Sequence, residues 1–365
     1  VKPIAIVFPQ YHQFAENDRL WGEGFTEWTM LKPMPRFVNN VTTRFPHKDI
    51  GYYNFLEFDH RRYMRIMADH FGVYGFAFYH YWFKDHPVMN APVDKMLEDG
   101  EPNKPFFFCW ANEAWTKRWD GSRNEILIDQ DYTDVQGNIN HFEYLLKFFR
   151  HKNYILVDGR PMFSFYRIEQ TDVSRLDAIM ALWDKLAVEN GLQGIHFVRW
   201  LGPFDNRIKS AHIAGGIEFE PGYSSAWRSV IATSKGVSVK SLFAKSSPTE
   251  QLFRSSQYKV YDRNIVWRNI ENKVLPKNVI CGTFATWNNA PRRNFTNDNY
   301  NSYPHMYMPD TLRGLQKHLE FMRAKVLYRR TRERYLLLTA WNEWNEQAQF
   351  EPSDVDGYDA LSAVK

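Results

Sequence analysis

Residues 335–346 read YLLLTAWNEWNE, an apolar run followed directly by a polar and aromatic one. An uninterrupted apolar run is typical of a parallel β-strand that is covered on both faces, whereas a half-exposed strand alternates between apolar and polar residues. Tyr335 to Ala340 is therefore predicted to be a buried strand. The segment that begins at Trp341 is predicted to lie at the carboxyl end of that strand.

Short apolar runs of the same kind recur along the chain. They cover Ile4 to Phe8, Val73 to Tyr79, Phe106 to Trp110, Met162 to Phe165, Ile195 to Trp200, Ile217 to Phe219 and Val279 to Phe284. Helical patterns lie between them, as where Phe142, Leu145 and Phe149 share one helix face. This alternation predicts an α/β protein with a parallel sheet, and about eight units favour closure into a (β/α)8 TIM barrel.

Two segments interrupt the alternation and are predicted to be elaborated βα loops. Residues 41–54 follow the first strand, and the serine- and lysine-rich residues 224–256 follow the sixth. No linker divides the chain, and barrels often exceed the usual domain length. Residues 1–365 are therefore predicted to form a single catalytic domain with a loop excursion around 224–256.

The composition is rich in aromatic residues and nearly balanced in charge. The chain has 13 Trp, 20 Tyr and 28 Phe, which suit stacking on the C–H faces of sugars, although most aromatic residues fill protein cores. The net charge of +4 arises from 46 basic and 42 acidic residues. Short basic clusters such as Pro291-Arg292-Arg293 are predicted to be solvated, so no nucleic-acid partner is expected.

Several other classes of site and segment are not expected. Cys109 and Cys281 lie in apolar runs and are predicted to be buried thiols. No clustered His and Cys spacing predicts a metal site, and no Gly-rich loop after a strand predicts a bound nucleotide or other cofactor. No run of about eighteen apolar residues predicts a membrane segment within this chain, and any targeting segment is expected upstream of Val1.

In a TIM barrel the site forms at the carboxyl ends of the strands, so the residues directly after each apolar run are the candidates. The predicted substrate-binding residues are Tyr11, His12, His80, Trp82, Asn112, Glu113, Trp115, Trp287 and Asn342. The two histidines are also candidates for acid–base groups, although a lone histidine is more often structural. The richest cluster follows the last strand.

Glu343 and Glu346 are the predicted catalytic residues. In a helical turn, residues three apart share one face, with Cβ atoms about 5–6 Å apart. Glycoside hydrolysis uses such a pair of carboxyl groups, whose repulsion moves their pKa values apart. The alternative is that both acids only stabilise a helix N-terminus, but the neighbouring Trp341 and Trp344 favour a dry catalytic pocket.

Glu113 is a rival partner for Glu343. The sequence Ala111-Asn112-Glu113 echoes Trp341-Asn342-Glu343, and the third and eighth strands of a closed barrel are three steps apart. A separation of about 5–5.5 Å between the two carboxyl groups predicts a nucleophile and an acid/base, and a wider gap predicts a water between them. The alternative for Glu113 is a salt bridge with Lys117 or Arg118.

Six motifs stand out along the chain: FPQYH (8–12), WGEGFTEW (21–28), YHYWF (79–83), CWANEAW (109–115), WNNAPRR (287–293) and AWNEWNE (340–346). They are similar to motifs of the WbsX-type domains of bacterial polysaccharide loci, which are related to glycoside hydrolase family 99. The resemblance spans nearly the whole chain. It implies a (β/α)8 barrel and, from the hydrolase relatives, retaining cleavage of α-mannosidic linkages inside a glycan chain.

The resemblance also implies how the two glutamates divide the work. The position of Glu343 implies a base that deprotonates the sugar 2-hydroxyl to give a 1,2-anhydro intermediate, and that of Glu346 implies the general acid/base. The hydrolases resemble Glu-Trp-His-Glu-Gly here, where this chain has Asn345 and Gln347. This departure concerns the contacts with the sugar.

Three functions follow from these observations. The leading hypothesis is a retaining glycoside hydrolase, endo-acting and mannosidase-like, on an α-linked polysaccharide or oligosaccharide. The alternatives are a glycosyltransferase of surface polysaccharide biosynthesis and a carbohydrate-binding module without chemistry. A hydrolase is expected to be secreted, periplasmic or at the cell surface, and a biosynthetic transferase to be cytoplasmic. The sequence predicts no oligomeric state.

Overall fold

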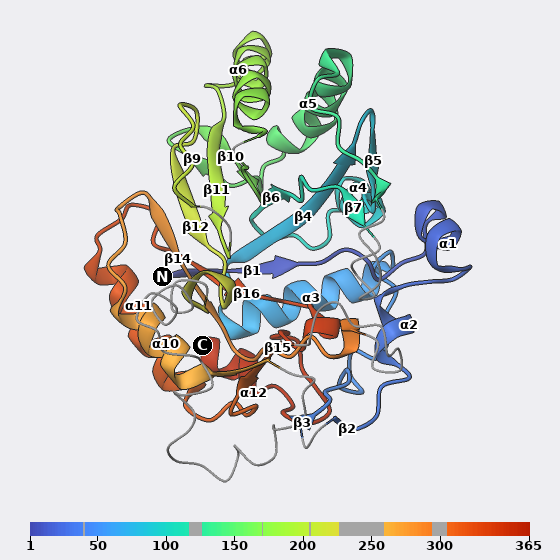
Figure 1. Ribbon diagram of the computed structural model, residues 1–365, viewed down its shortest axis with the longest axis vertical. Coiled ribbons are helices and arrows are strands. Elements are labelled where there is room, and N and C mark those ends of the chain that lie inside the picture. The colour runs from blue at the N-terminus through green and yellow to red at the C-terminus, as the bar shows by residue number, and fades with distance from the viewer. Residues whose placement is uncertain (39–40, 117–125, 170, 204–205, 226–258, 294–304) are drawn as a thin grey trace.

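The computed structural model describes residues 1–38, 41–116, 126–169, 171–203, 206–225, 259–293 and 305–365 (Figure 1). Within these residues, eight parallel strands close into a barrel. They are β1 (Lys2–Val7), β4 (Gly75–Phe83), β6 (Phe106–Trp110), β10 (Arg160–Phe165), β11 (His196–Leu201), β12 (Gly215–Glu218), β14 (Val279–Phe284) and β16 (Tyr335–Thr339). They correspond to the eight predicted apolar runs.

The strands follow one another around the ring in chain order. The order is β1-β16-β14-β12-β11-β10-β6-β4, and β4 pairs with β1 to close the barrel. In the closing register Ile4 lies beside Gly75, and on the other side of β1 it lies beside Leu337. The predicted (β/α)8 TIM barrel is confirmed, and the first and last strands are neighbours.

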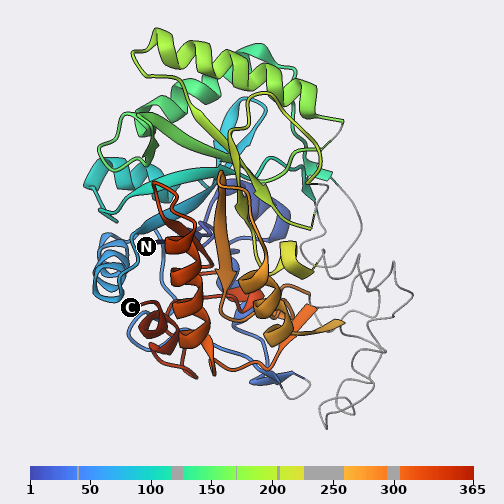
Figure 2. The same cartoon turned by 90° about the vertical axis from the view of Figure 1, so that its left-hand side faces the viewer.

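Helices surround the strands (Figure 2). The helices after successive strands are α3 (Phe58–Phe71), α4 (Ala91–Asp99), α5 (Val135–Phe149), α6 (Val173–Glu189), α10 (Arg263–Asn272), α11 (Leu315–Tyr328) and α12 (Asp359–Val364). Of the described residues between β11 and β12, none is helical. The aromatic core lies between the strands and the helices, where Trp183 of α6 stacks on Trp110 at 5.9 Å.

Smaller elements elaborate the loops. The segment from β1 to α3 contains α1 (Ala15–Trp21), α2 (Glu27–Leu31) and the antiparallel pair β2 (Phe37–Val38) and β3 (Val41–Thr42). β5 (His86–Val88) pairs with β4, β9 (Leu156–Val157) with β10, β7 (Trp115–Thr116) with β8 (Ile126–Ile128), and β13 (Lys259–Asp262) with β15 (His305–Met308). Of the predicted excursion around 224–256, only residues 224 and 225 lie within the described chain.

Candidate active site

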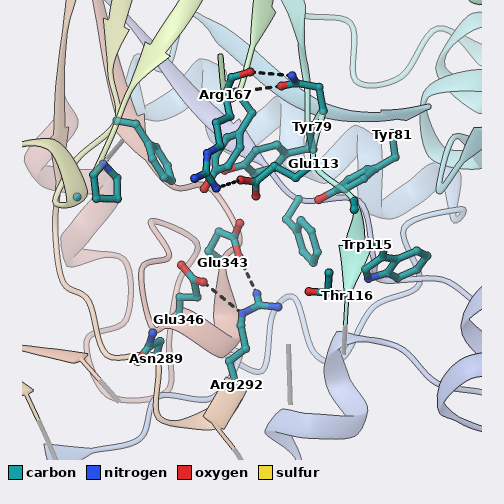
Figure 3. Close-up of a pocket in the computed structure, with 18 of the residues that line it drawn as sticks. Tyr79, Tyr81, Glu113, Trp115, Thr116, Arg167, Asn289, Arg292, Glu343 and Glu346 are labelled. Carbon is teal, nitrogen blue, oxygen red and sulfur yellow. Dashed lines mark hydrogen bonds and ion pairs between the residues drawn. The ribbon is translucent and has the colours of Figure 1, made fainter. Parts of the chain in front are cut away.

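A cavity of about 1380 Å³ opens at the carboxyl ends of the barrel strands (Figure 3). Each barrel strand or the loop after it contributes to its lining, which includes Phe8, Tyr79, Tyr81, Glu113, Trp115, Tyr166, Arg167, Pro203, Phe219, Trp287, Asn289, Arg292, Glu343 and Glu346. Pockets for small ligands usually enclose roughly 300–1,000 Å³. This cavity is therefore large enough for several linked sugar rings.

The acidic segment after β16 turns tightly into this cavity. Its residues form a 3-10 turn, η3 (Trp344–Glu346), in which the amide of Glu346 donates to the carbonyl of Glu343 at 3.1 Å. Both carboxyl groups line the cavity. Glu343 and Glu346 therefore lie on the same side of the chain, as predicted, but on a 3-10 turn.

Gln347 ends this turn in the left-handed region, with φ 48°. A side chain there is disfavoured by roughly 1–2 kcal/mol. Hydrogen bonds of the Gln347 side chain offset this cost. Its Oε1 accepts from the Arg44 backbone N–H at 2.7 Å, and its Nε2 donates to the Arg44 and Trp344 carbonyls at 3.1 and 2.9 Å. The turn is therefore held although the residue is not glycine.

Arg292 connects the acidic groups of the site. It belongs to η2 (Pro291–Arg293), in the loop after β14. Its Nη2 lies 3.0 Å from Oε2 of Glu343, its Nε lies 3.2 Å from Oε1 of Glu346, and Nη1 lies 3.2 Å from Oε1 of Glu27. One guanidinium therefore contacts three carboxylates in a largely buried position.

These surroundings change the ionisation of Glu343. Burial raises the pKa of Glu343 well above its usual range, the negative charge of Glu346 raises it further, and the contact with Arg292 lowers it. A carboxyl group with a raised pKa takes up a proton more readily than an exposed one. The arrangement therefore suits proton transfer near neutral pH.

Aromatic side chains form the other walls. Tyr79 and Tyr81 of β4 and Tyr166 after β10 line the cavity, and burial raises the pKa of each hydroxyl well above its usual value. They are therefore neutral hydrogen-bond donors. Trp115 stacks on Phe83, with ring centroids 6.3 Å apart, and both line the cavity.

Glu113 and Arg167 form a second polar group in the lining. Arg167 Nη1 lies 2.5 Å from Oε1 of Glu113, and the same guanidinium contacts Glu169. Figure 3 shows this pair on the opposite side of the view from Arg292. The predicted alternative partners Lys117 and Arg118 lie outside the described residues.

Comparison with known proteins identifies the family. Residues 3–364 match the family described as Glycosyltransferase WbsX. The chain belongs to this family. It is 28% identical over 365 residues to "Uncharacterized protein WxcX" of Xanthomonas campestris pv. campestris (strain B100), and the match covers 99% of this chain and 49% of WxcX. The same protein of strain ATCC 33913 gives the same identity and coverage, so the chain spans about half the length of these curated relatives.

Solved structures show the same fold at low identity. The GH99 endo-alpha-mannosidase from Bacteroides thetaiotaomicron is 14% identical, with a TM-score of 0.53 and coverage of 99% of this chain and 95% of that chain. A "Glycoside hydrolase-like protein" is also 14% identical, with a TM-score of 0.52 and coverage of 96% and 98%. These likenesses confirm that the WbsX-family chain resembles family 99 in its fold.

The predicted residues His80 and Trp82 lie outside the cavity lining. Both point from β4 towards α5, where His80 Nε2 lies 2.7 Å from Nε2 of His141 and Trp82 stacks on the His141 ring at 4.4 Å. Burial lowers the pKa of His80 to about 3. Because side chains alternate along a strand, their neighbours Tyr79 and Tyr81 face the cavity instead.

Tyr11, His12 and Asn342 are also buried without lining the cavity. Tyr11 donates to the carbonyl of Asn342, and His12 Nδ1 lies 3.0 Å from the Pro9 carbonyl. Burial lowers the pKa of His12 to about 4, so it is neutral at neutral pH. Of the predicted substrate-binding residues, Asn112, Glu113, Trp115 and Trp287 do line the cavity.

Sequence reasoning missed the roles of Arg292 and Glu27. Arg292 was expected in a solvated basic cluster, and that expectation is wrong because its side chain is only 10% exposed among carboxylates. Glu27 is fully buried in α2. The signal for both was their position in the quoted motifs WNNAPRR and WGEGFTEW, since charged residues are seldom buried unless they are paired.

Two kinds of feature are absent from the described part of the WbsX-family chain. No group of three or more His, Cys, Asp or Glu side chains there is arranged to hold a metal ion. Among its helices, none combines the length and apolar character needed to span a membrane.

Proposed function

We propose that this chain is a retaining glycoside hydrolase that acts on an α-linked polysaccharide or oligosaccharide. The observation that carries the proposal is the pair Glu343 and Glu346, which share the Arg292 guanidinium in a large cavity at the strand ends. The fold of the endo-alpha-mannosidase supports a related chemistry. The four aromatic and polar strand-end residues Asn112, Glu113, Trp115 and Trp287 are proposed to contact the glycan.

In the proposed first step, Glu343 removes the proton of the sugar 2-hydroxyl while that oxygen attacks the anomeric carbon. Glu346 protonates the departing glycosidic oxygen, and a 1,2-anhydro sugar forms. In the second step, Glu346 deprotonates a water that attacks the anomeric carbon, and Glu343 returns its proton to the 2-oxygen. Two inversions give net retention, and both carboxyl groups recover their starting protonation.

In this mechanism neither carboxylate attacks carbon, so the two carboxyl groups can lie on the same side of the sugar. The geometry supports this division of roles. Both are on one short turn and serve the same face of the cavity. Two neighbouring carboxyl groups resist ionising together, so the pair retains one proton for the leaving group. Arg292 stabilises the ionised partner.

A glycosyltransferase is the second candidate, and the family description favours it. A transferase would bind a nucleotide- or lipid-phosphate sugar and needs positive charge for its phosphates. The arginines of the described lining are engaged by carboxylates, with Arg167 on Glu113 and Glu169, Arg175 at 3.7 Å from Asp172, and Arg292 on Glu343 and Glu346. This pairing opposes phosphate binding and favours the hydrolase.

The test is release of reducing ends from a panel of α-linked polysaccharides. Glu343→Gln and Glu346→Gln are each expected to lower kcat by about 10²–10⁴-fold, the usual worth of general acid–base catalysis, without loss of folding. Glu320→Gln, on the exposed side of α11, is the matched control. Wild-type turnover in both active-site variants would refute the assignment, and tight binding of a nucleotide sugar would favour the transferase.

A further inference from the structure

Glu27 is a buried acid that does not line the cavity but contacts Arg292, which does. Its carboxylate is 0% exposed. Two of its contacts are with Arg292, from Nη1 at 3.2 Å and from Nη2 at 3.3 Å. Because an unpaired buried carboxylate is strongly destabilising, this two-point pairing explains how Glu27 is tolerated.

The pairing with Glu27 fixes the direction of the remaining donors of Arg292. A guanidinium is planar, and its N–H groups point in fixed directions. With one edge held by Glu27, Nη2 also donates to Glu343 at 3.0 Å and Nε lies 3.2 Å from Glu346. The pairing with Glu27 therefore constrains the plane that both cavity carboxylates contact.

Glu27 also holds the acidic turn itself. Nδ2 of Asn345, between the two cavity glutamates, donates to the Glu27 carboxylate at 2.5 Å and to the Glu27 carbonyl at 2.8 Å. The same buried acid thus orients Arg292 and the middle of the turn that carries Glu343 and Glu346.

Within the described residues, the charged and titratable groups around Glu343 come from four elements and from the segments after two strands. They are Glu346 on η3, Arg292 on η2, Glu27 on α2, Tyr79 and Tyr81 on β4, and Tyr11 and Tyr166 after β1 and β10. Burial keeps the tyrosines neutral. Of the charged groups, Glu27 raises the pKa of Glu343 and Arg292 lowers it, so the two act on Glu343 in opposite directions.

We propose that Glu27 is a positioning residue that holds Arg292 and Asn345 against the two carboxyl groups of the site, and that the Glu27–Arg292 pair sets the pH range in which Glu343 and Glu346 work. The inference rests on the proposed hydrolase function. It assigns no contact with the substrate to Glu27.

The experiment is the pH profile of kcat/KM for the wild type, Glu27→Gln and Arg292→Gln. Loss of the Glu27 charge is expected to move the acid limb to lower pH, and loss of the Arg292 charge to move it to higher pH, each by about one pH unit. Glu27→Asp keeps the charge but shortens the side chain. Its kcat is therefore expected to fall while the acid limb of the pH profile stays at the wild-type pH. In the two Gln variants, which remove a charge, a merely structural role would lower kcat/KM without moving the limb.

A second measurement is independent of activity. Titration of ¹³C-labelled glutamate carboxyls by NMR, with the Glu343 signal assigned by its absence in Glu343→Gln, is expected to show the same opposite shifts. If no glycan is cleaved, the proposed hydrolase function fails, and this titration still decides the role of Glu27. Shifts in one direction for both variants, or none, overturn the inference.

Folding is checked by thermal melting of each variant. If Glu27→Gln or Arg292→Gln does not fold, Glu27→Asp and Arg292→Lys replace them, since both keep the charges. Glu27→Asp shortens the side chain, and Arg292→Lys removes the planar set of donors. The inference then requires kcat to fall while KM and the melting temperature stay at their wild-type values, whereas a merely structural role would lower the melting temperature together with kcat. An unchanged kcat in both charge-conserving variants would overturn it.

Discussion

Two asparagine side chains explain why the Asn-Glu sequence occurs twice. Asn112 accepts from the Arg167 amide at 3.0 Å and donates to the Arg167 carbonyl at 2.7 Å. Asn342 makes the same pair of bonds with Phe8, at 2.8 and 3.0 Å. Each asparagine joins the end of its strand to the end of a neighbouring strand, and each following glutamate, Glu113 or Glu343, is left to line the cavity.

At the residue scale, Glu351 gives a prediction about stability. It is buried beneath the site and accepts hydrogen bonds from Trp341 and Trp344 at 2.8 Å each and from Tyr53 at 3.0 Å. Burial raises the pKa of Glu351 to about 8, although these donors lower it. Its pKa in the unfolded chain is about 4.3.

Between these two pKa values the folded chain binds more protons than the unfolded chain. The contribution of Glu351 is therefore fully present below about pH 4.3 and is lost as the pH rises towards about 8, by at most roughly 1.4 kcal/mol per pH unit. We expect urea unfolding at pH 5 and pH 8 to show a smaller loss of stability in Glu351→Gln than in the wild type. Equal losses would mean that Glu351 is ionised throughout.

At the scale of an element, β4 carries both structural and site residues on alternating faces. All nine of its residues are buried. Tyr81 faces the cavity, and His80 packs against His141 of α5. The face of each residue cannot be deduced from the sequence, because a strand covered on both sides has no alternation of apolar and polar residues.

This arrangement predicts different effects for two adjacent substitutions. Tyr81→Ala is expected to lower kcat/KM by at least about tenfold, because it removes a wall and a hydroxyl donor of the cavity, an effect of roughly 1.4 kcal/mol. His80→Ala is expected to lower the free energy of unfolding by about 1–3 kcal/mol and to leave kcat/KM unchanged well below the melting temperature. A lower kcat/KM in His80→Ala would contradict this placement and would mean that His80 contributes to the site.

At the scale of the whole molecule, the charge of the cavity differs from that of the chain. The chain has a net charge of +4. The described lining carries the carboxyl groups of Glu113, Asp129, Glu169, Asp172, Glu343 and Glu346 against the guanidinium groups of Arg167, Arg175 and Arg292, with the imidazole of His305. The sequence total therefore hides an acidic cavity.

A neutral α-linked oligosaccharide is expected to bind more tightly than a uronate-bearing analogue of the same length. Like charges repel strongly in a cavity with low-dielectric walls, and salt screens the repulsion. Calorimetric titration at low and high ionic strength checks this, and the preference should shrink as salt is added. Equal affinities at low salt, or tighter binding of the uronate, would contradict the expectation.

The sequence by itself determined the barrel and the place of two glutamates directly after its last strand. Eight apolar runs with helices between them predict a closed parallel sheet, because strands covered on both faces have this pattern. Since the carboxyl ends of such strands meet at one face, the acids after the last strand were expected in the site. These inferences depend on local patterns, which a sequence displays directly.

Only the tertiary structure decided which residues share that site. The pairing of β1 with β16 brings the first and last strands together, and Glu27 and Asn345, 318 residues apart, are hydrogen-bonded. Arg292 comes from a third segment, and its burial depends on carboxylates that no local pattern connects with it. The facing of Tyr81 rather than His80 likewise depends on where α5 packs. These features depend on contacts between distant segments, and a local sequence pattern does not predict such contacts.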